Sequence, residues 1–238
     1  MLGGRGSLGN SGGKLFRRRS NPLFKLSLFG EPNFSVGLIG NLVCRIGSSA
    51  VPFLVPLLLQ LQLGYTPLHS GLMMLPAALA GTLTKRWIAP LVRRYGYDTF
   101  LLVNTIIVGS AIVAFALITR GTPLIVEIVI LAVFGGANSM QFAAMNSVTL
   151  KGLSHEDAGS GNSLFSMVQM LAIGLGVSIG GGLVNLFSAQ WGSAALGFRL
   201  SFVCVGVITL VSAWVFRHLD EAPVTRDVRR QATQGAGR

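Results

Sequence analysis

Six apolar stretches, each long enough to cross a bilayer, follow one another between Asn33 and Phe216. A helix needs about 20 mostly apolar residues to span the hydrocarbon core. Charged residues make up only 11% of the 238 residues, against roughly 25% in soluble domains. The sequence therefore predicts an all-α integral membrane protein, a six-transmembrane-helix bundle surrounded by the lipid bilayer. We expect its spans at 33–61, 70–92, 99–119, 123–146, 160–187 and 197–216.

The predicted bundle forms one domain, residues 33–218, between two polar segments. Residues 1–32 are predicted to be a basic cytoplasmic segment with a short lead-in at the membrane surface. Residues 219–238 are predicted to be a polar cytoplasmic tail. No apolar run directly follows the basic residues near the start, so a cleaved signal peptide is not expected.

The net charge of +11 is distributed unevenly along the predicted topology. Most of the 19 Lys and Arg residues fall in loops and tails on the side that holds both termini, while the opposite side holds Arg120 and Arg199. Basic loops stay in the cytoplasm, so both termini are expected to be cytoplasmic. The positive charge is therefore interpreted as a signal of orientation in the membrane. Nucleic acid is not an expected partner.

Arg45 lies near the middle of the first span, where a charge costs at least about 2.5–3.5 kcal/mol. Asn41, Arg45, Ser48 and Pro52 recur at spacings of three and four residues, on one helical face. Two interpretations stay open. The face either lines a cavity, or Arg45 is a structural cation that binds carbonyl groups of adjacent helices.

Neutral polar residues mark the fourth and fifth spans. Asn138 and Gln141 fall on one arc of the fourth span, and Gln169 belongs to a polar stripe on the fifth. Such groups hydrogen-bond either a substrate or a neighbouring helix. Asn146 lies near a helix end, where headgroups or water can satisfy it. The candidate substrate-cavity residues are therefore Asn41, Arg45, Asn138, Gln141 and Gln169.

Small residues crowd the second half of the fifth span. Gly176 and Gly180 form a G-x-x-x-G, and Gly182 ends a second small-x-x-x-small pattern. Small residues let helix backbones approach closely, so these three glycines are predicted to pack helices.

Other charged residues in the spans have simpler interpretations. Lys85 and Arg86 are placed to snorkel towards headgroups, and Glu127 lies too near a helix start for a deep proton-coupling site. No metal-ligand spacing, nucleotide-binding loop or nucleophile–base pair is present, so neither a metal site nor an enzyme is expected.

Several motifs resemble a known family. The run Ser70-Gly71-Leu72-Met73-Met74-Leu75-Pro76 resembles the start of a core helix in drug:proton antiporters of the major facilitator superfamily, and the 14-span EmrB/QacA-type branch is the closest fit. The run Ser160-Gly161-Asn162-Ser163-Leu164-Phe165 is similar to the matching end of a later helix in that family. The resemblance covers roughly residues 21–220. It implies half of a major facilitator superfamily fold, the C-terminal six-helix bundle of a proton-coupled exporter in a bacterial inner membrane.

The same resemblance implies partners. An N-terminal six-helix half would carry the membrane carboxylate that couples the proton gradient in this family, and a small molecule would be the substrate. No cofactor other than the proton gradient is implied. Two other interpretations stay open, a non-transporting assembly or regulatory partner of another transporter, and a truncated product that is inactive alone.

Overall fold

A computed structural model describes residues 32–151 and 158–216. All regular elements in those ranges are helices: α2 (Pro32–Leu61), α3 (Pro67–Leu72), α4 (Leu75–Thr84), the 3₁₀ turn η3 (Lys85–Trp87), α5 (Ile88–Tyr95), α6 (Tyr97–Ala114), the 3₁₀ turn η4 (Phe115–Leu117), α7 (Leu124–Lys151), α8 (Ala158–Trp191) and α9 (Ala194–Phe216). The all-α prediction is confirmed. The predicted terminal segments 1–32 and 219–238 lie outside the described residues, except for Pro32.

Five helices within the described ranges are long and apolar enough to cross a membrane, at Leu38–Leu61, Tyr97–Leu117, Leu124–Thr149, Gly161–Trp191 and Ala194–Trp214. They agree with five of the six predicted spans and establish a multi-pass membrane protein. The remaining prediction, a continuous span over 70–92, differs from the structure. That region is divided into α3, α4, η3 and α5.

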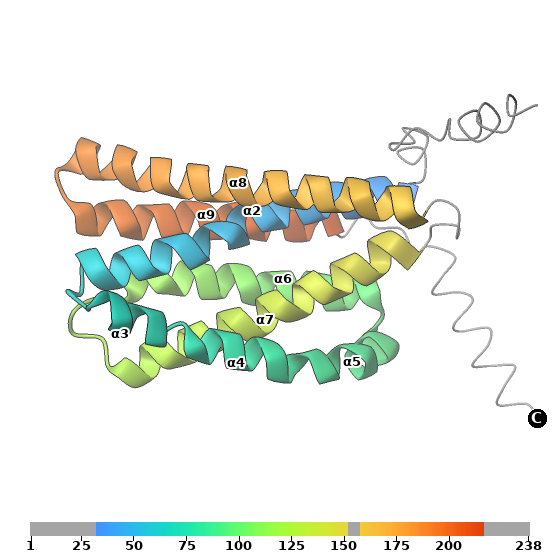
Figure 1. Cartoon of the computed structure of the whole chain (residues 1–238), viewed down its shortest axis with the longest axis horizontal. Coiled ribbons are helices and arrows are strands. Elements are labelled where there is room, and N and C mark those ends of the chain that lie inside the picture. Colours follow the sequence, from blue (N-terminus) through green and yellow to red (C-terminus); the bar gives the residue numbers. More distant parts are fainter. Residues whose placement is uncertain (1–31, 152–157, 217–238) are drawn as a thin grey trace, which may run out of the picture.

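Two prolines explain the division. Pro76 lies in the first turn of α4, and without an N–H it cannot donate to the carbonyl group of Leu72. Pro90, the third residue of α5, likewise cannot donate to Arg86, and the backbone winds more tightly over Lys85–Trp87 just before it. Figure 1 shows α4 and α5 running on in one direction beside α7. Residues 75–95 at 1.5 Å per residue still extend roughly 30 Å, which matches the hydrocarbon thickness.

The helices run lengthwise beside one another (Figure 1). α2, α8 and α9 pack together, α4 packs on α7, and α6 contacts both α7 and α9. We call the end where α2 begins and α9 ends the near end, and the opposite end, with the α2–α3, α6–α7 and α8–α9 connections, the far end. α8 contacts α2 and α9 but barely reaches α7.

Aromatic and aliphatic side chains fill the centre of the bundle. Phe115 lies 5.5 Å from Phe202 and 5.8 Å from Phe134, measured between ring centroids. Leu54 of α2 is fully buried in the same cluster. Close approach of the backbones depends on small residues, because a Cβ on Gly135 of α7 would overlap the backbone of Ala77 in α4. α8 contributes least, with only 17% of its apolar window buried.

Candidate functional site

A groove of about 800 Å³ opens between α2, α4 and α7. Its apolar wall includes Pro52, Met74, Phe134 and Phe142, and its polar lining consists of Arg45, Thr82, Lys85, Asn138, Ser139 and Asn146. Both charged lining residues are cations. Gly81 and Gly135 lie at the contact between α4 and α7 that forms the floor of the groove.

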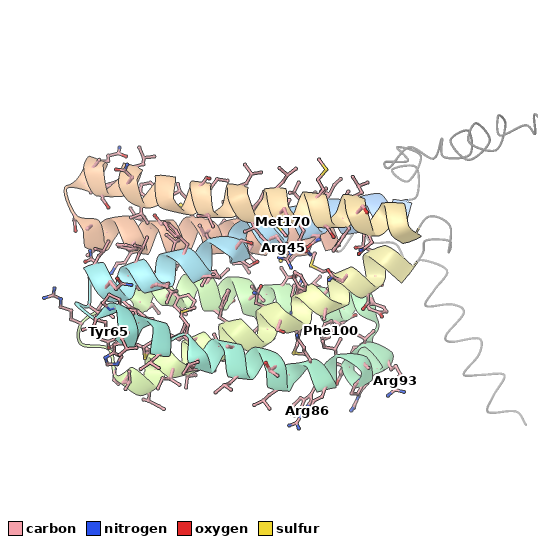
Figure 2. All side chains as sticks on the ribbon, in the orientation of Figure 1. Arg45, Tyr65, Arg86, Arg93, Phe100 and Met170 are labelled. Atoms are coloured by element: carbon pink, nitrogen blue, oxygen red, sulfur yellow. The ribbon has the colours of Figure 1, made fainter. Side chains whose placement is uncertain are left out.

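Arg45 reaches across the groove from α2 to α7. Its guanidinium carbon lies 3.5 Å from the centroid of the Phe142 ring, a cation–π contact. Figure 2 shows Arg45 on the part of α2 that crosses between α8 and α7. Its Nη2 is buried and makes no hydrogen bond to any residue that the structure describes. The guanidinium group is therefore held in place by stacking while a donor stays unpaired.

Of the five predicted cavity residues, the structure brings Arg45 and Asn138 together in the groove. Asn41 is fully buried one turn before Arg45, and neither atom of its amide group has a partner among the described residues. Gln169 on α8 is partly buried, and its Nε2 is unpaired within the same part of the chain. Neither Asn41 nor Gln169 lines the groove.

Gln141 forms hydrogen bonds to α6 and does not line the groove. Its Oε1 accepts from Asn104 Nδ2 at 2.7 Å, and its Nε2 donates to the Thr105 hydroxyl at 2.6 Å. Asn104 also donates to the Ala137 carbonyl group at 2.8 Å. At about 100° per residue, Gln141 is turned by roughly 60–100° from Asn138 and Phe142. That rotation directs it towards α6, where it is buried between two helices instead of lining the groove.

Lys85 and Asn146 were not among the predicted cavity residues, although both line the groove. Lys85 had a plausible headgroup role and Asn146 lay near a helix end. A sequence signal did exist, because Asn138, Phe142 and Asn146 recur every four residues on α7. Thr82 and Lys85 are likewise three residues apart, near the end of α4.

The predicted packing glycines differ in their surroundings. A Cβ on Gly176 would overlap the Ile46 carbonyl group of α2, and one on Gly180 would lie 2.9 Å from the Ala50 Cβ. Nothing lies within 4 Å of a Cβ on Gly182. α8 therefore contacts α2 closely through Gly176 and Gly180, while Gly182 faces open space.

A separate polar cluster lies at the far end, where Figure 2 labels Tyr65. The Tyr65 hydroxyl donates to Glu127 Oε2 at 3.4 Å, and its ring stacks on His69 with centroids 4.7 Å apart. Glu127 is only 1% exposed. Burial, and then the neighbouring Glu127 carboxylate, raise the pKa of the Tyr65 phenol above its ordinary value. This cluster does not border the groove.

A smaller cavity of about 250 Å³, lined by Arg120, Arg199 and Phe115 among others, also lies near the far end. Arg120 Nε donates to the Gln62 carbonyl group at 2.8 Å, which ties the α6–α7 connection to the end of α2. Among the described residues, no three His, Cys, Asp or Glu side chains come together in a way that could hold a metal ion.

Comparison with known proteins adds a family to this geometry. A family model described as Major Facilitator Superfamily matches residues 38–236. The relatives include proteins named "Putative multidrug resistance protein MdtD". That of Pectobacterium atrosepticum is 37% identical over 222 residues, 91% of this chain and 47% of the relative. That of Yersinia enterocolitica is 36% identical over 226 residues, 92% and 48% respectively. The chain thus spans about half the length of the curated relatives it matches.

Proposed function

The chain belongs to the Major Facilitator Superfamily, and from this premise we propose that it is the C-terminal six-helix bundle of a proton-coupled exporter of drugs or other small molecules. In this proposal it pairs with an N-terminal six-helix bundle, and the groove between α2, α4 and α7 is its half of the substrate cavity. Such transporters work by rocking one bundle against the other around a central site.

The observation that carries the proposal is the groove itself. Its described walls come from α2, from α4 with its flanking residues Met74 and Lys85, and from α7, and its lining mixes aromatic rings with amide, hydroxyl and cationic groups. Binding sites for small molecules combine an apolar wall with a few polar groups in this way. A second bundle placed over the open side would enclose the site. The names of the relatives, which refer to multidrug resistance, support an export role.

Proton coupling in this proposal depends on the second bundle. Among the described residues, Glu127 is the single buried carboxylate, and it lies in the far-end cluster instead of the groove. A carboxylate that takes up a proton in exchange for substrate would therefore be supplied across the cavity. We place the assembly in a bacterial inner membrane with both termini cytoplasmic, because the basic residues concentrate on the side of the termini.

The proposal is tested by reconstitution in cells that lack endogenous drug exporters. The chain is co-expressed with the N-terminal bundle of a relative, and loss of a preloaded fluorescent dye is followed with and without a protonophore. We expect protonophore-sensitive efflux only when both bundles are present. Each bundle alone is the control, and dye retention equal to that of the controls would refute the proposal.

A second candidate is a non-transporting partner that binds another membrane protein through α8. The observation in its favour is that a Cβ added to Gly174 or Gly182 of α8 would meet no neighbouring atom within 4 Å, so small residues remain available for close helix contact. Copurification with an intact transporter, without dye flux in the assay above, would favour this second candidate.

A further inference from the structure

The charged side chains that line the groove are both positive. Arg45 and Lys85 line it, and within residues 32–151 and 158–216 no Asp or Glu does. The remaining polar lining groups are neutral hydroxyls and amides. A cationic ligand would be repelled by both charges, whereas an anionic ligand would be attracted to both.

Arg45 has the arrangement of an anion-binding group. The guanidinium carbon lies over the Phe142 ring, and Nη2 is left without a hydrogen-bond acceptor among the described residues. A planar guanidinium binds carboxylate, phosphonate or sulfonate oxygens through two parallel N–H donors. A charge buried within a span normally has a partner, and an oxyanion in the groove would supply one.

The apolar wall defines the rest of the ligand. Phe134, Phe142 and Met74 offer ring faces and a thioether beside the cation, while Asn138 and Ser139 provide neutral hydrogen-bonding groups. We propose that the groove binds an amphipathic organic anion, with its oxyanion on Arg45, secondary attraction from Lys85 and its apolar part against Phe134 and Met74. The claim that such an anion is the exported substrate rests on the proposed function. The claim that the groove binds it can be tested on this chain alone.

The binding test compares two xanthene dyes of similar shape and opposite charge, fluorescein and rhodamine 123. Affinity for the purified full chain in phosphatidylcholine nanodiscs is measured by fluorescence anisotropy at pH 8. We expect fluorescein to bind at least about tenfold more tightly than rhodamine 123, since a hydrogen bond to a charged group contributes that much. Weaker or equal binding of fluorescein, or none, would overturn the inference.

Variants identify the residue responsible. R45Q is expected to lose the preference for fluorescein, R45K to keep part of it, and K85Q to weaken fluorescein binding by a few fold. R86Q is the matched control, because Arg86 adjoins Lys85 but projects away from the bundle (Figure 2) and does not line the groove. If R45Q fails to fold, K85Q and R45K still decide the matter, and unchanged fluorescein affinity in both would contradict the proposal.

Two further experiments distinguish the proposed anion site from a lipid-headgroup site and from a failure of the proposed function. Replacing part of the phosphatidylcholine with phosphatidylglycerol should leave fluorescein binding in place, and its abolition would assign the site to a lipid headgroup instead. In cells that also express the N-terminal bundle, export of rhodamine 123 without export of fluorescein would overturn this inference and keep the proposed function. Export of neither dye, with fluorescein binding intact, would refute the proposed function and keep the anion site.

Discussion

Asn104 on α6 donates a hydrogen bond of 2.7 Å to Gln141 on α7 in a part of the bundle where both side chains are buried. The Gln141 amide also donates to Thr105, so one side chain satisfies two groups of the neighbouring helix. Paired polar groups of this kind hold spans together where no hydrophobic force drives helices to associate.

The Gln141 network should contribute measurably to stability. Q141L leaves the Asn104 amide and the Thr105 hydroxyl short of a partner and is expected to lower the free energy of unfolding by about 1 kcal/mol. The measurement is unfolding of the purified protein in mixed micelles with increasing dodecyl sulfate. N138L is the control, since Asn138 lines the groove, and we expect a change within about 0.5 kcal/mol. Equal losses in both variants would show that the network contributes nothing specific.

Two glycines of α8 should respond to the same substitution with opposite sign. G176A places a methyl group against the Ile46 carbonyl group and is expected to destabilise the bundle by about 1–3 kcal/mol. G182A meets nothing within 4 Å and should stabilise the helix slightly, by up to about 1 kcal/mol. Thermal unfolding in detergent provides the readout. Matching shifts in the two variants would argue against the close α2–α8 contact.

The phenol of Tyr65 should ionise at a higher pH than an ordinary tyrosine. Burial is the first cause and the Glu127 carboxylate the second, so its pKa lies above the ordinary value of about 10. Because the folded-state pKa is raised, the neutral phenol contributes stability that is present below about pH 10 and is lost as the pH rises through the folded pKa.

Tyrosine ionisation can be followed at 295 nm, and the contribution of Tyr65 is the difference between the wild type and Y65F. E127Q should move that difference titration to lower pH, because it removes the carboxylate charge and leaves most of the burial. A Tyr65 titration at its ordinary pH, unaffected by E127Q, would be inconsistent with the contact.

The proposed orientation predicts opposite accessibility for two turns. In a background with Cys44 and Cys204 replaced by Ser, G121C in the α6–α7 connection should react with a membrane-impermeant maleimide added to intact cells. Y95C, at the end of α5, should react only after the membrane is permeabilised. Both positions are exposed in the structure, so burial does not confound the comparison. The reverse labelling pattern would invert the topology.

The sequence predicts the spans well because membrane insertion depends on length and hydropathy, which are local properties. Five of the six spans correspond to continuous helices. The second span, predicted at 70–92, is divided, and the reason is also local, since Pro76 and Pro90 each remove a backbone donor. Both prolines are visible in the sequence, and each predicts an interruption of the helix at its position.

Side-chain roles were harder to predict because they depend on which helix lies opposite. Asn138 and Gln141 share one arc of α7, yet Asn138 lines the groove and Gln141 bonds to α6. Lys85 could reach headgroups by its length alone, and only the position of α4 against α7 places it in the groove. Gly180 and Gly182 look alike in sequence, although α2 packs against Gly180 alone.

The divided second crossing also bears on how the protein is made. α4 is short, and a pair of cations follows it, so it inserts less readily into lipid than a continuous apolar helix. Its stabilising contacts lie on α7, where the Thr84 hydroxyl donates to the Gly136 carbonyl group 52 residues further along the chain. Those contacts become available only after the ribosome has made the third and fourth crossings. Biogenesis of this bundle is consequently not a simple sequence of independent insertions, and a chain that stalls before α7 would leave α4 without its neighbour.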